Sequence, residues 1–310
     1  MGNQLSAVSQ MFPPKPTWGV NDIPDLSGKV VIVTGGNTGV GRETVKPLLA
    51  HGAKVYIAAR NEAKTKSAIE DLKKETGKEA VSLQLDLADL VSVKAAAEEF
   101  LSKESKLDIL FNNAGVMACP VEQLTKQGFD MQIGTNVLGH YYFTQLLLPA
   151  LKAVHANNPS EKARVVITSS SAMYVTTLDL DIFEDTPKRR KQSPMALYNQ
   201  SKHANVVHAR EFARRYGDDI VTTSLNPGNI RTELQRYLAG VQRFIILRLL
   251  HPAPLGALTQ LYAGTAPEAA NLNGKFLIPW ARVGAARKEA LDPQTGEKLW
   301  SWLESHSQNV

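Results

Sequence analysis

The sequence predicts an α/β protein with one doubly wound parallel sheet of about seven strands and helices on both faces. Short runs of β-branched and aliphatic residues recur along the chain and alternate with segments of helical composition. The first of these runs ends in a glycine-rich turn, which a helix follows. The 310 residues, 43% hydrophobic and 21% charged, are enough for one large α/β domain or two small ones. We find no run of about 18 apolar residues, so we expect no transmembrane helix.

Residues 1–26 are proline-rich and aperiodic, so we expect an N-terminal arm ahead of a single domain at 27–310. The chain begins Met1-Gly2-Asn3-Gln4-Leu5-Ser6, which fits the N-myristoylation pattern with Gly2 as the acceptor. The alternative is an unmodified tail that happens to begin with Met-Gly. A single acyl chain would give only marginal, reversible membrane binding.

The first strand is expected at residues 30–33, and the glycine turn Thr34-Gly35-Gly36-Asn37-Thr38-Gly39-Val40-Gly41 follows it. Glycines adopt backbone conformations that other residues resist. They also let backbone amides approach a pyrophosphate at the positive end of the next helix. The order of strand, glycine turn and helix therefore predicts a dinucleotide site.

The second strand, at residues 54–59, ends in Ala59-Arg60 and lacks the acid that would bind the adenosine ribose hydroxyls of NAD. An arginine at this position can accommodate a 2′-phosphate, so Arg60 favours NADP. The alternative is that Arg60 caps the strand and pairs with Glu62. The net charge of +5 mildly favours an anionic cofactor.

The third and fourth strands, at residues 80–85 and 107–111, also end in candidate ligand residues. Asp86, followed by Leu87, could accept a hydrogen bond from an adenine amine, or it could cap the helix expected at 91–101. The fourth strand runs into Asn112-Asn113-Ala114-Gly115, where small residues would let the backbone lie against a ligand. In isolation this sequence could be only a turn.

Two further candidates come from the middle of the chain. A long helix is expected at 129–155, and Asn136 inside it is costly unless it is hydrogen-bonded or bends the helix. The fifth strand, at 164–168, is followed by Ser169-Ser170-Ser171, whose hydroxyls lie where doubly wound sheets bind ligands. We expect functional roles for Asn136 and for a serine here.

Residues 172–195 are expected to be irregular, and the basic run Lys188-Arg189-Arg190-Lys191 within them to be a solvated loop. No aromatic residues interleave with this run, so we expect no nucleic-acid partner. The single cysteine, Cys119, excludes a disulfide framework and indicates a reducing, cytoplasmic compartment. We expect Cys119 to be a small buried hydrophobe, and we expect no bound metal.

Tyr198 and Lys202 stand four residues apart at the start of a helix expected to end near residue 217, so they share a helix face. A nearby ammonium stabilises the phenolate and lowers the pKa of the phenol. A tyrosine of this kind can exchange a proton near neutral pH, as an acid–base catalyst must. The pair alone is weak evidence, because ordinary surface pairing also produces it.

The sixth strand, at 220–225, meets Asn226-Pro227-Gly228-Asn229-Ile230-Arg231-Thr232, a rigid turn that could close over a flat ring. A substrate lid is expected at about 232–258. Its apolar segment 237–256 is core or lid, or alternatively contacts a membrane. A helix at 255–270, a strand at 274–278 and a terminal helix at 297–306 complete the chain.

The order of these motifs over residues 28–305 resembles the short-chain dehydrogenase/reductase family, and most closely its retinol-dehydrogenase-like and WW-domain-oxidoreductase branch. The motifs are the glycine turn, Asn112-Asn113-Ala114-Gly115, Ser170 with Tyr198 and Lys202, and Pro227-Gly228. No WW domain precedes the fold in this sequence. The resemblance implies a single Rossmann-fold domain that forms dimers, a homodimer among them, or tetramers, and in some members monomers.

The resemblance also implies residue roles. Tyr198 would be the general acid in carbonyl reduction and the base in alcohol oxidation, and Lys202 would lower its pKa and bind the nicotinamide ribose. Ser170 would hold the substrate oxygen, with Ser169 and Ser171 left open, and Asn136 would support a water-linked proton path. The implied cofactor residues are Gly35, Asn37, Thr38, Gly39, Val40, Gly41, Arg60, Asp86, Leu87, Asn113, Ala114, Gly115, Tyr198, Lys202, Pro227, Gly228, Ile230 and Thr232.

We therefore expect an NADP-dependent oxidoreductase, with NAD the less favoured cofactor, that acts on a lipophilic carbonyl or alcohol. The alternative is a non-catalytic NADP(H)-binding regulator or scaffold of the same fold. The intact set of Asn136, Ser170, Tyr198 and Lys202 favours the enzyme. We expect a cytoplasmic protein, with peripheral membrane contact through acylated Gly2 or through residues 237–256 as an alternative.

Overall fold

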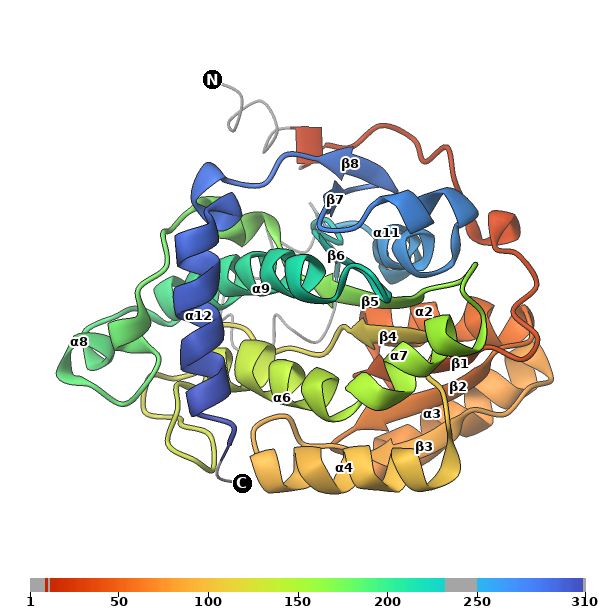
Figure 1. Ribbon diagram of the computed structural model, residues 1–310, viewed down its shortest axis with the longest axis horizontal. Coiled ribbons are helices and arrows are strands. Elements are labelled where there is room, and N and C mark those ends of the chain that lie inside the picture. The colour runs from red at the N-terminus through yellow and green to blue at the C-terminus, as the bar shows by residue number, and fades with distance from the viewer. Residues whose placement is uncertain (1–8, 11, 232–249, 309–310) are drawn as a thin grey trace.

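The computed structural model describes residues 9, 10, 12–231 and 250–308, and these form an α/β fold around one eight-stranded sheet (Figure 1). The strand order is β3-β2-β1-β4-β5-β6-β7-β8, and every neighbouring pair is parallel except β7 with β8. The strands are β1 (Val30–Thr34), β2 (Lys54–Ala59), β3 (Val81–Gln84), β4 (Ile109–Asn112), β5 (Ala163–Thr168), β6 (Ile220–Leu225), β7 (Phe276–Ile278) and β8 (Arg282–Gly284). The predicted doubly wound class is confirmed.

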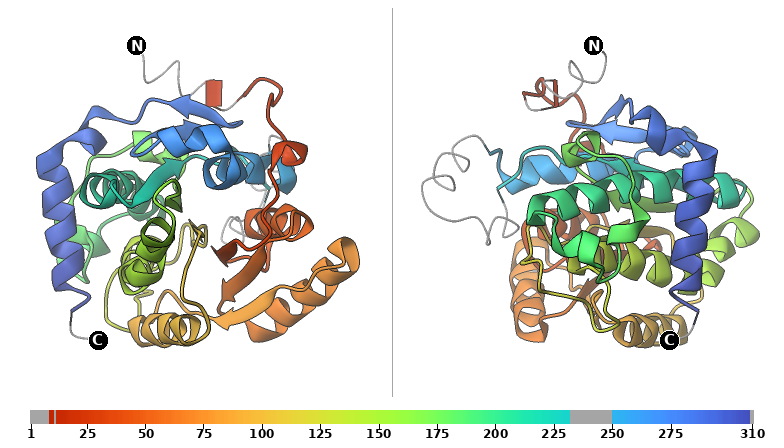
Figure 2. Two further views of the ribbon diagram at one scale, coloured as in Figure 1. Left: turned by 45° about the vertical axis from the view of Figure 1, so that its right-hand side comes forward. Right: turned by 90° about the vertical axis from the view of Figure 1, so that its left-hand side faces the viewer.

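Helices cover both faces of the sheet, and Figure 2 gives two further views of these layers. One face packs against α2 (Gly39–Ala50), α3 (Glu62–Thr76) and α11 (Ala253–Thr265). The other packs against α4 (Leu90–Lys103), α6 (Gly139–Leu146), α7 (Leu148–Asn157) and α9 (Pro194–Tyr216), with α12 (Pro293–Ser305) against α9. Every residue of β1 and of β6 is buried, as expected for strands covered on both faces.

Short helical segments complete the described chain. They are η1 (Val20–Asp22), α5 (Met131–Ile133), the π-helical turn η2 (Gly134–Leu138), η3 (Ser171–Tyr174), η4 (Leu180–Ile182), α8 (Pro187–Arg190), η6 (Pro267–Asn271) and η7 (Lys288–Leu291). Among the described residues, no helix has both the length and the hydropathy needed to cross a bilayer.

The site lies where the direction of chain progression reverses. From β1 the chain builds outward through β2 to β3, and it then returns to place β4 on the other side of β1. The loops that leave β1 and β4 therefore diverge, and a crevice opens at the carboxyl ends of the strands.

Several predicted boundaries differ from the structure. The helix expected at 129–155 is divided into α5, the π-helical turn η2, α6 and α7, and Asn136 lies within the π-helical turn. The eighth strand was missed because β8 has only three residues, too few for a periodic signal. The helix of Tyr198 begins four residues earlier than expected, at Pro194, where Ser193 caps it.

The prediction of a solvated basic loop is wrong for Arg189. This side chain is 1% exposed. Its Nε donates to Oδ2 of Asp130 at 3.0 Å, and its Nη2 donates to the carbonyls of Val121 at 2.6 Å and Gln123 at 3.1 Å. A buried carboxylate needs a charged partner, and α8 supplies it from the basic run. Cys119 is buried, as expected.

Candidate functional site

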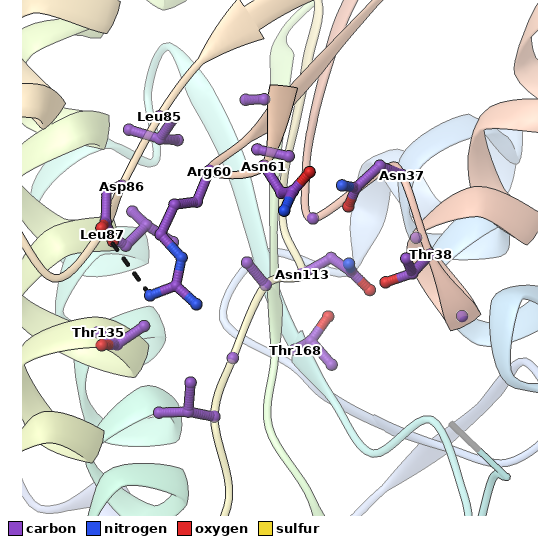
Figure 3. Close-up of a pocket in the computed structure, with 18 of the residues that line it drawn as sticks. Asn37, Thr38, Arg60, Asn61, Leu85, Asp86, Leu87, Asn113, Thr135 and Thr168 are labelled. Atoms are coloured by element: carbon purple, nitrogen blue, oxygen red, sulfur yellow. Dashed lines mark ion pairs between the residues drawn. The ribbon is translucent and has the colours of Figure 1, made fainter. Parts of the chain in front are cut away.

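A cavity of about 330 Å³ occupies the crevice at the carboxyl edge of the sheet (Figure 3). Thirteen predicted cofactor residues line it: Gly35, Asn37, Thr38, Gly39, Val40, Gly41, Arg60, Asp86, Leu87, Asn113, Ala114, Gly115 and Pro227. Sequence reasoning missed further lining residues, among them Asn61, Lys64, Leu85, Ala88, Val116, Met131, Thr135 and Thr168. Most of these residues stand at the end of a strand or within about four positions of a predicted residue. Their place at strand ends was therefore the signal that could have identified them.

The predicted cofactor residues Gly228, Ile230, Tyr198 and Lys202 are not among the residues that line the cavity. Gly228 packs against Trp280, and Ile230 is buried against Val40 and Leu258. Thr232 falls outside the described residues, as does most of the segment 237–256.

The turn between β1 and α2 forms a backbone cradle. Gly35 and Gly39 have φ of +65° and +52°, in the left-handed region that favours glycine. A Cβ on Gly41 would lie 2.3 Å from the carbonyl oxygen of Gly35, so only glycine fits there. The turn opens onto the N-terminus of the 12-residue helix α2, whose positive end favours an anion. These residues fit the diphosphate of a dinucleotide.

Thr34 joins this turn to the loop that leaves β4. Its Oγ1 accepts hydrogen bonds from the backbone amides of Asn113 and Ala114, both at 2.9 Å. The Asn113 side chain returns a bond to the Thr34 carbonyl at 2.8 Å. Two cavity walls are thus held in register by one threonine at the end of β1.

His140, which sequence reasoning missed, lies beneath this junction. Its Nδ1 is 3.1 Å from the carbonyl oxygen of Asn136, and its Nε2 is 2.9 Å from Thr34 Oγ1. Burial lowers the pKa of His140 to about 3, so the ring is neutral. A carbonyl only accepts, so Nδ1 carries the proton and Nε2 accepts from Thr34. The available signal was a histidine four residues after Asn136 on an apolar helix.

Asn136 is completely buried, and its side chain is fully engaged. Its Oδ1 accepts from the Val116 amide at 2.8 Å, and its Nδ2 donates to the Val116 carbonyl at 3.0 Å and to Ser201 Oγ at 2.9 Å. A Cβ on Gly115 would lie 3.1 Å from Asn136 Oδ1 and 3.6 Å from Lys202 Nζ. Asn136 therefore lies beside Lys202 at the wall of the cavity.

The structure brings Tyr198 and Lys202 together on one face of α9. Lys202 Nζ is 5.8 Å from the centre of the Tyr198 ring and donates to the Thr168 carbonyl at 3.0 Å. Burial lowers the pKa of Lys202 to about 8. Burial also raises the pKa of Tyr198 to about 12, although the Ser170 side chain acts in the lowering direction. The expected lowering of the phenol pKa is not found in this structure, because burial has the largest effect on the Tyr198 pKa and raises it.

The three consecutive serines have different partners. Ser169 Oγ donates to the Lys202 carbonyl at 2.6 Å, and Ser171 begins η3. Ser170 Oγ accepts from the Ala172 amide at 3.2 Å, and the Ser170 side chain acts to lower the pKa of Tyr198. Of the three serine side chains, that of Ser170 is the one that acts on the pKa of Tyr198.

Arg60 marks the other end of the cavity. Its guanidinium points into the cavity and forms an ion pair with Asp86 at 3.9 Å (Figure 3). The alternative that Asp86 caps the next helix is wrong, because Asp89 caps α4 by accepting from the Val91 amide at 3.1 Å. Asp86 instead accepts from the Ala88 amide at 3.0 Å, which holds its carboxylate at the cavity wall.

Replacing Lys202 with methionine is expected to stabilise the fold at pH 7 by about 1–3 kcal/mol. The shift of its pKa from 10.5 to about 8 corresponds to about 3 kcal/mol of unfavourable burial, at about 1.4 kcal/mol per pH unit. Because the folded pKa is the lower one, this penalty is full below about pH 8 and declines as pH rises toward 10.5. Urea unfolding at pH 7 and at pH 9.5 measures both effects, with exposed Lys66→Met as control. A variant less stable than wild type at pH 7 would contradict this expectation.

Comparisons with known proteins agree with this geometry. The family model described as short chain dehydrogenase matches residues 29–179. The chain is 66% identical to a short-chain dehydrogenase/reductase of Armillaria gallica, over 98% of each chain. It is 39% identical to human retinol dehydrogenase 12, over 89% of this chain and 85% of that protein.

Solved structures share the fold. An uncharacterized protein from Mycobacterium paratuberculosis aligns with a TM-score of 0.73 and 30% identity, over 94% of this chain and 97% of its own. A 3-ketoacyl-(acyl-carrier-protein) reductase from Brucella melitensis, complexed with NADH, aligns with a TM-score of 0.63 and 26% identity, over 81% of this chain and 96% of its own. With the cradle, the Ser170–Tyr198–Lys202 cluster and these relatives, the chain is a member of the short-chain dehydrogenase/reductase family of oxidoreductases, in its retinol-dehydrogenase-like branch.

Proposed function

We propose that this oxidoreductase uses NADP(H) to interconvert a lipophilic carbonyl compound and its alcohol, with Tyr198 as the acid–base group. The observation that carries the proposal is the pairing of a cluster of half-buried Ser170 with buried Tyr198 and Lys202 and a cavity that has Arg60 at its far end. The preference for a lipophilic substrate is supported by Val116 and Met131, apolar side chains that line the cavity.

When bound, the nicotinamide ring supplies a hydride to the substrate carbon or accepts one from it. Tyr198 is protonated at neutral pH because its pKa is about 12, so it is ready to donate a proton to the substrate oxygen in reduction. The Ser170 hydroxyl can donate a hydrogen bond to the same oxygen as negative charge grows there. Lys202, with a pKa of about 8, is a cation at pH 7 and stabilises the phenolate that Tyr198 leaves behind.

The choice of NADP over NAD rests on the end of β2. Ala59-Arg60 places a cation where a ribose-binding acid would favour NAD, and Lys64 lines the same part of the cavity. A 2′-phosphate would meet two basic side chains there, whereas the two hydroxyls of an NAD ribose would meet no acid on this strand end.

Replacing Arg60 with alanine is therefore expected to weaken NADPH binding about 10–100-fold, because one charge-assisted hydrogen bond contributes about 1.5–3 kcal/mol. NADH binding should change by less than about threefold, since it lacks the phosphate. Fluorescence titration of both cofactors measures this difference, with Lys66→Ala as a control for net charge on the adjoining helix. Equal losses for the two cofactors would refute the assignment.

A further inference from the structure

We propose that Gln10, in the N-terminal arm, is a positioning residue that joins the two loops on either side of the reacting centre. The first is the segment after Ser170, which contains the helical turn η3, and the second is the turn Asn226-Pro227-Gly228, which follows β6. The inference rests on the proposed function for what is being oriented, namely a nicotinamide ring between these loops. It assigns a role in the site to a segment that precedes the residues that the family model matches.

Gln10 is buried although it belongs to the arm. Its side chain is 1% exposed. Its Oε1 accepts from Asn226 Nδ2 at 2.9 Å, and its Nε2 donates to the Tyr174 hydroxyl at 3.1 Å. Each end of the amide meets a group of matching donor or acceptor character, so the orientation of the amide is determined.

The first partner, Asn226, shapes the turn after β6. It is 2% exposed, and its Oδ1 accepts from the Gly228 amide at 3.0 Å. Gly228 has φ of +91°, and a Cβ there would lie 3.0 Å from the Trp280 ring. The turn is thus closely packed on its outer side, while Pro227 between these two residues lines the cavity. Holding the Asn226 side chain fixes the position of that proline.

The second partner, Tyr174, ends the helical turn that begins directly after Ser170. Its hydroxyl donates to the Ala285 carbonyl at 2.5 Å, beyond β8. The Ser9 carbonyl accepts from Arg282 Nη2 at 3.3 Å, so the arm is also held by β8. In Figure 1 this red segment of the arm lies beside β8. Gln10 therefore bonds directly to Tyr174 after Ser170 and to Asn226 beside Pro227. Through the Tyr174 hydroxyl it is also linked to the chain just beyond β8.

Removing the Gln10 amide would leave Asn226 Nδ2 buried without its partner and would loosen both loops. Displacement of a reacting group by about 1 Å can reduce turnover about 100-fold. The diphosphate cradle and Arg60 belong to other loops of the same cavity and should be unaffected. The expected result is a lower kcat with nearly unchanged NADPH affinity.

The test compares the full-length chain with Gln10→Ala and with Phe12→Ala, a control in the same arm whose side chain is 70% exposed. Hydrogen–deuterium exchange is measured with and without NADPH over residues 170–175 and 226–231. We expect Gln10→Ala to raise exchange at least about threefold in both segments and to lower kcat about 10-fold or more, with NADPH Kd within about threefold. Phe12→Ala should match wild type in every measurement.

A double variant separates a specific link from general loosening of the arm. If Gln10 acts through Asn226, Gln10→Ala should change kcat and exchange much less in the Asn226→Ala background than in wild type. Unchanged exchange and unchanged kcat in Gln10→Ala would overturn the proposal, as would full additivity of the two substitutions. If wild type shows no turnover, the proposed function fails, while the exchange data still decide whether Gln10 orders the two loops.

Discussion

Replacing Tyr198 with phenylalanine is expected to lower kcat for carbonyl reduction by about 10²–10⁴-fold, because general acid catalysis typically contributes that much. The substitution removes one hydroxyl from a side chain that is 6% exposed, so the packing of α9 is preserved. NADPH Kd should stay within about threefold of wild type, because the diphosphate cradle and Arg60 are untouched. Steady-state kinetics and a fluorescence titration together measure both quantities.

The matched control is Tyr262→Phe, the same chemical change on α11, where the ring packs edge-on against Trp18. This variant should retain wild-type kcat. Wild-type turnover in Tyr198→Phe would mean that another group delivers the proton. A similar loss of kcat in both variants would indicate that removing either hydroxyl lowers the stability of the fold, and a thermal melt would reveal this.

Replacing Arg189 with alanine is expected to destabilise the fold by about 3–5 kcal/mol, as is typical when one partner of a buried ion pair is removed. Asp130 would keep its place, since its side chain also accepts from the amides of Gln132 and Ile133. Burial already raises the pKa of Asp130, and loss of the guanidinium would raise it further. A carboxyl whose pKa is raised in the folded protein becomes neutral as the pH falls, and a neutral group is less costly to bury. The loss of stability in Arg189→Ala should therefore be smaller at pH 5 than at pH 7.

The control for this prediction is Lys188→Ala, one residue away in α8. Lys188 is exposed and pairs with Asp179 and Asp181, so its loss should change stability by less than about 1 kcal/mol. Urea unfolding of both variants at the two pH values provides the comparison. Similar small effects at residues 188 and 189 would show that the buried pair contributes little.

The sequence was most informative where a ligand site follows from local backbone rules. The glycine turn, Arg60, Asp86 and the turn after β4 all stand at the ends of parallel strands, and parallel strands end at one edge of a sheet. Thirteen of the predicted residues consequently line a single cavity. The spacing of Tyr198 and Lys202 similarly fixed their common face on α9.

The sequence was least informative where burial decides the outcome. Arg189 belongs to a basic run, and only the tertiary position of Asp130 explains why it is buried. The pKa of Tyr198 depends on desolvation, which residue spacing does not reveal. The role of Gln10 depends on contacts with residues more than 160 positions away. Neither the burial of Arg189 and Tyr198 nor the hydrogen bonds of Gln10 produce a periodic pattern in the sequence.

The most direct test of the proposed activity is isotope transfer from NADPH deuterated at C4 of the dihydronicotinamide. Purified protein would be incubated with this cofactor and a panel of lipophilic aldehydes and ketones, and the products analysed by mass spectrometry. We expect at least one alcohol that carries a single deuterium on the carbinol carbon, and loss of that product in Tyr198→Phe. Tight NADPH binding with no labelled alcohol from any panel member would contradict the enzyme assignment and favour a cofactor-binding regulator.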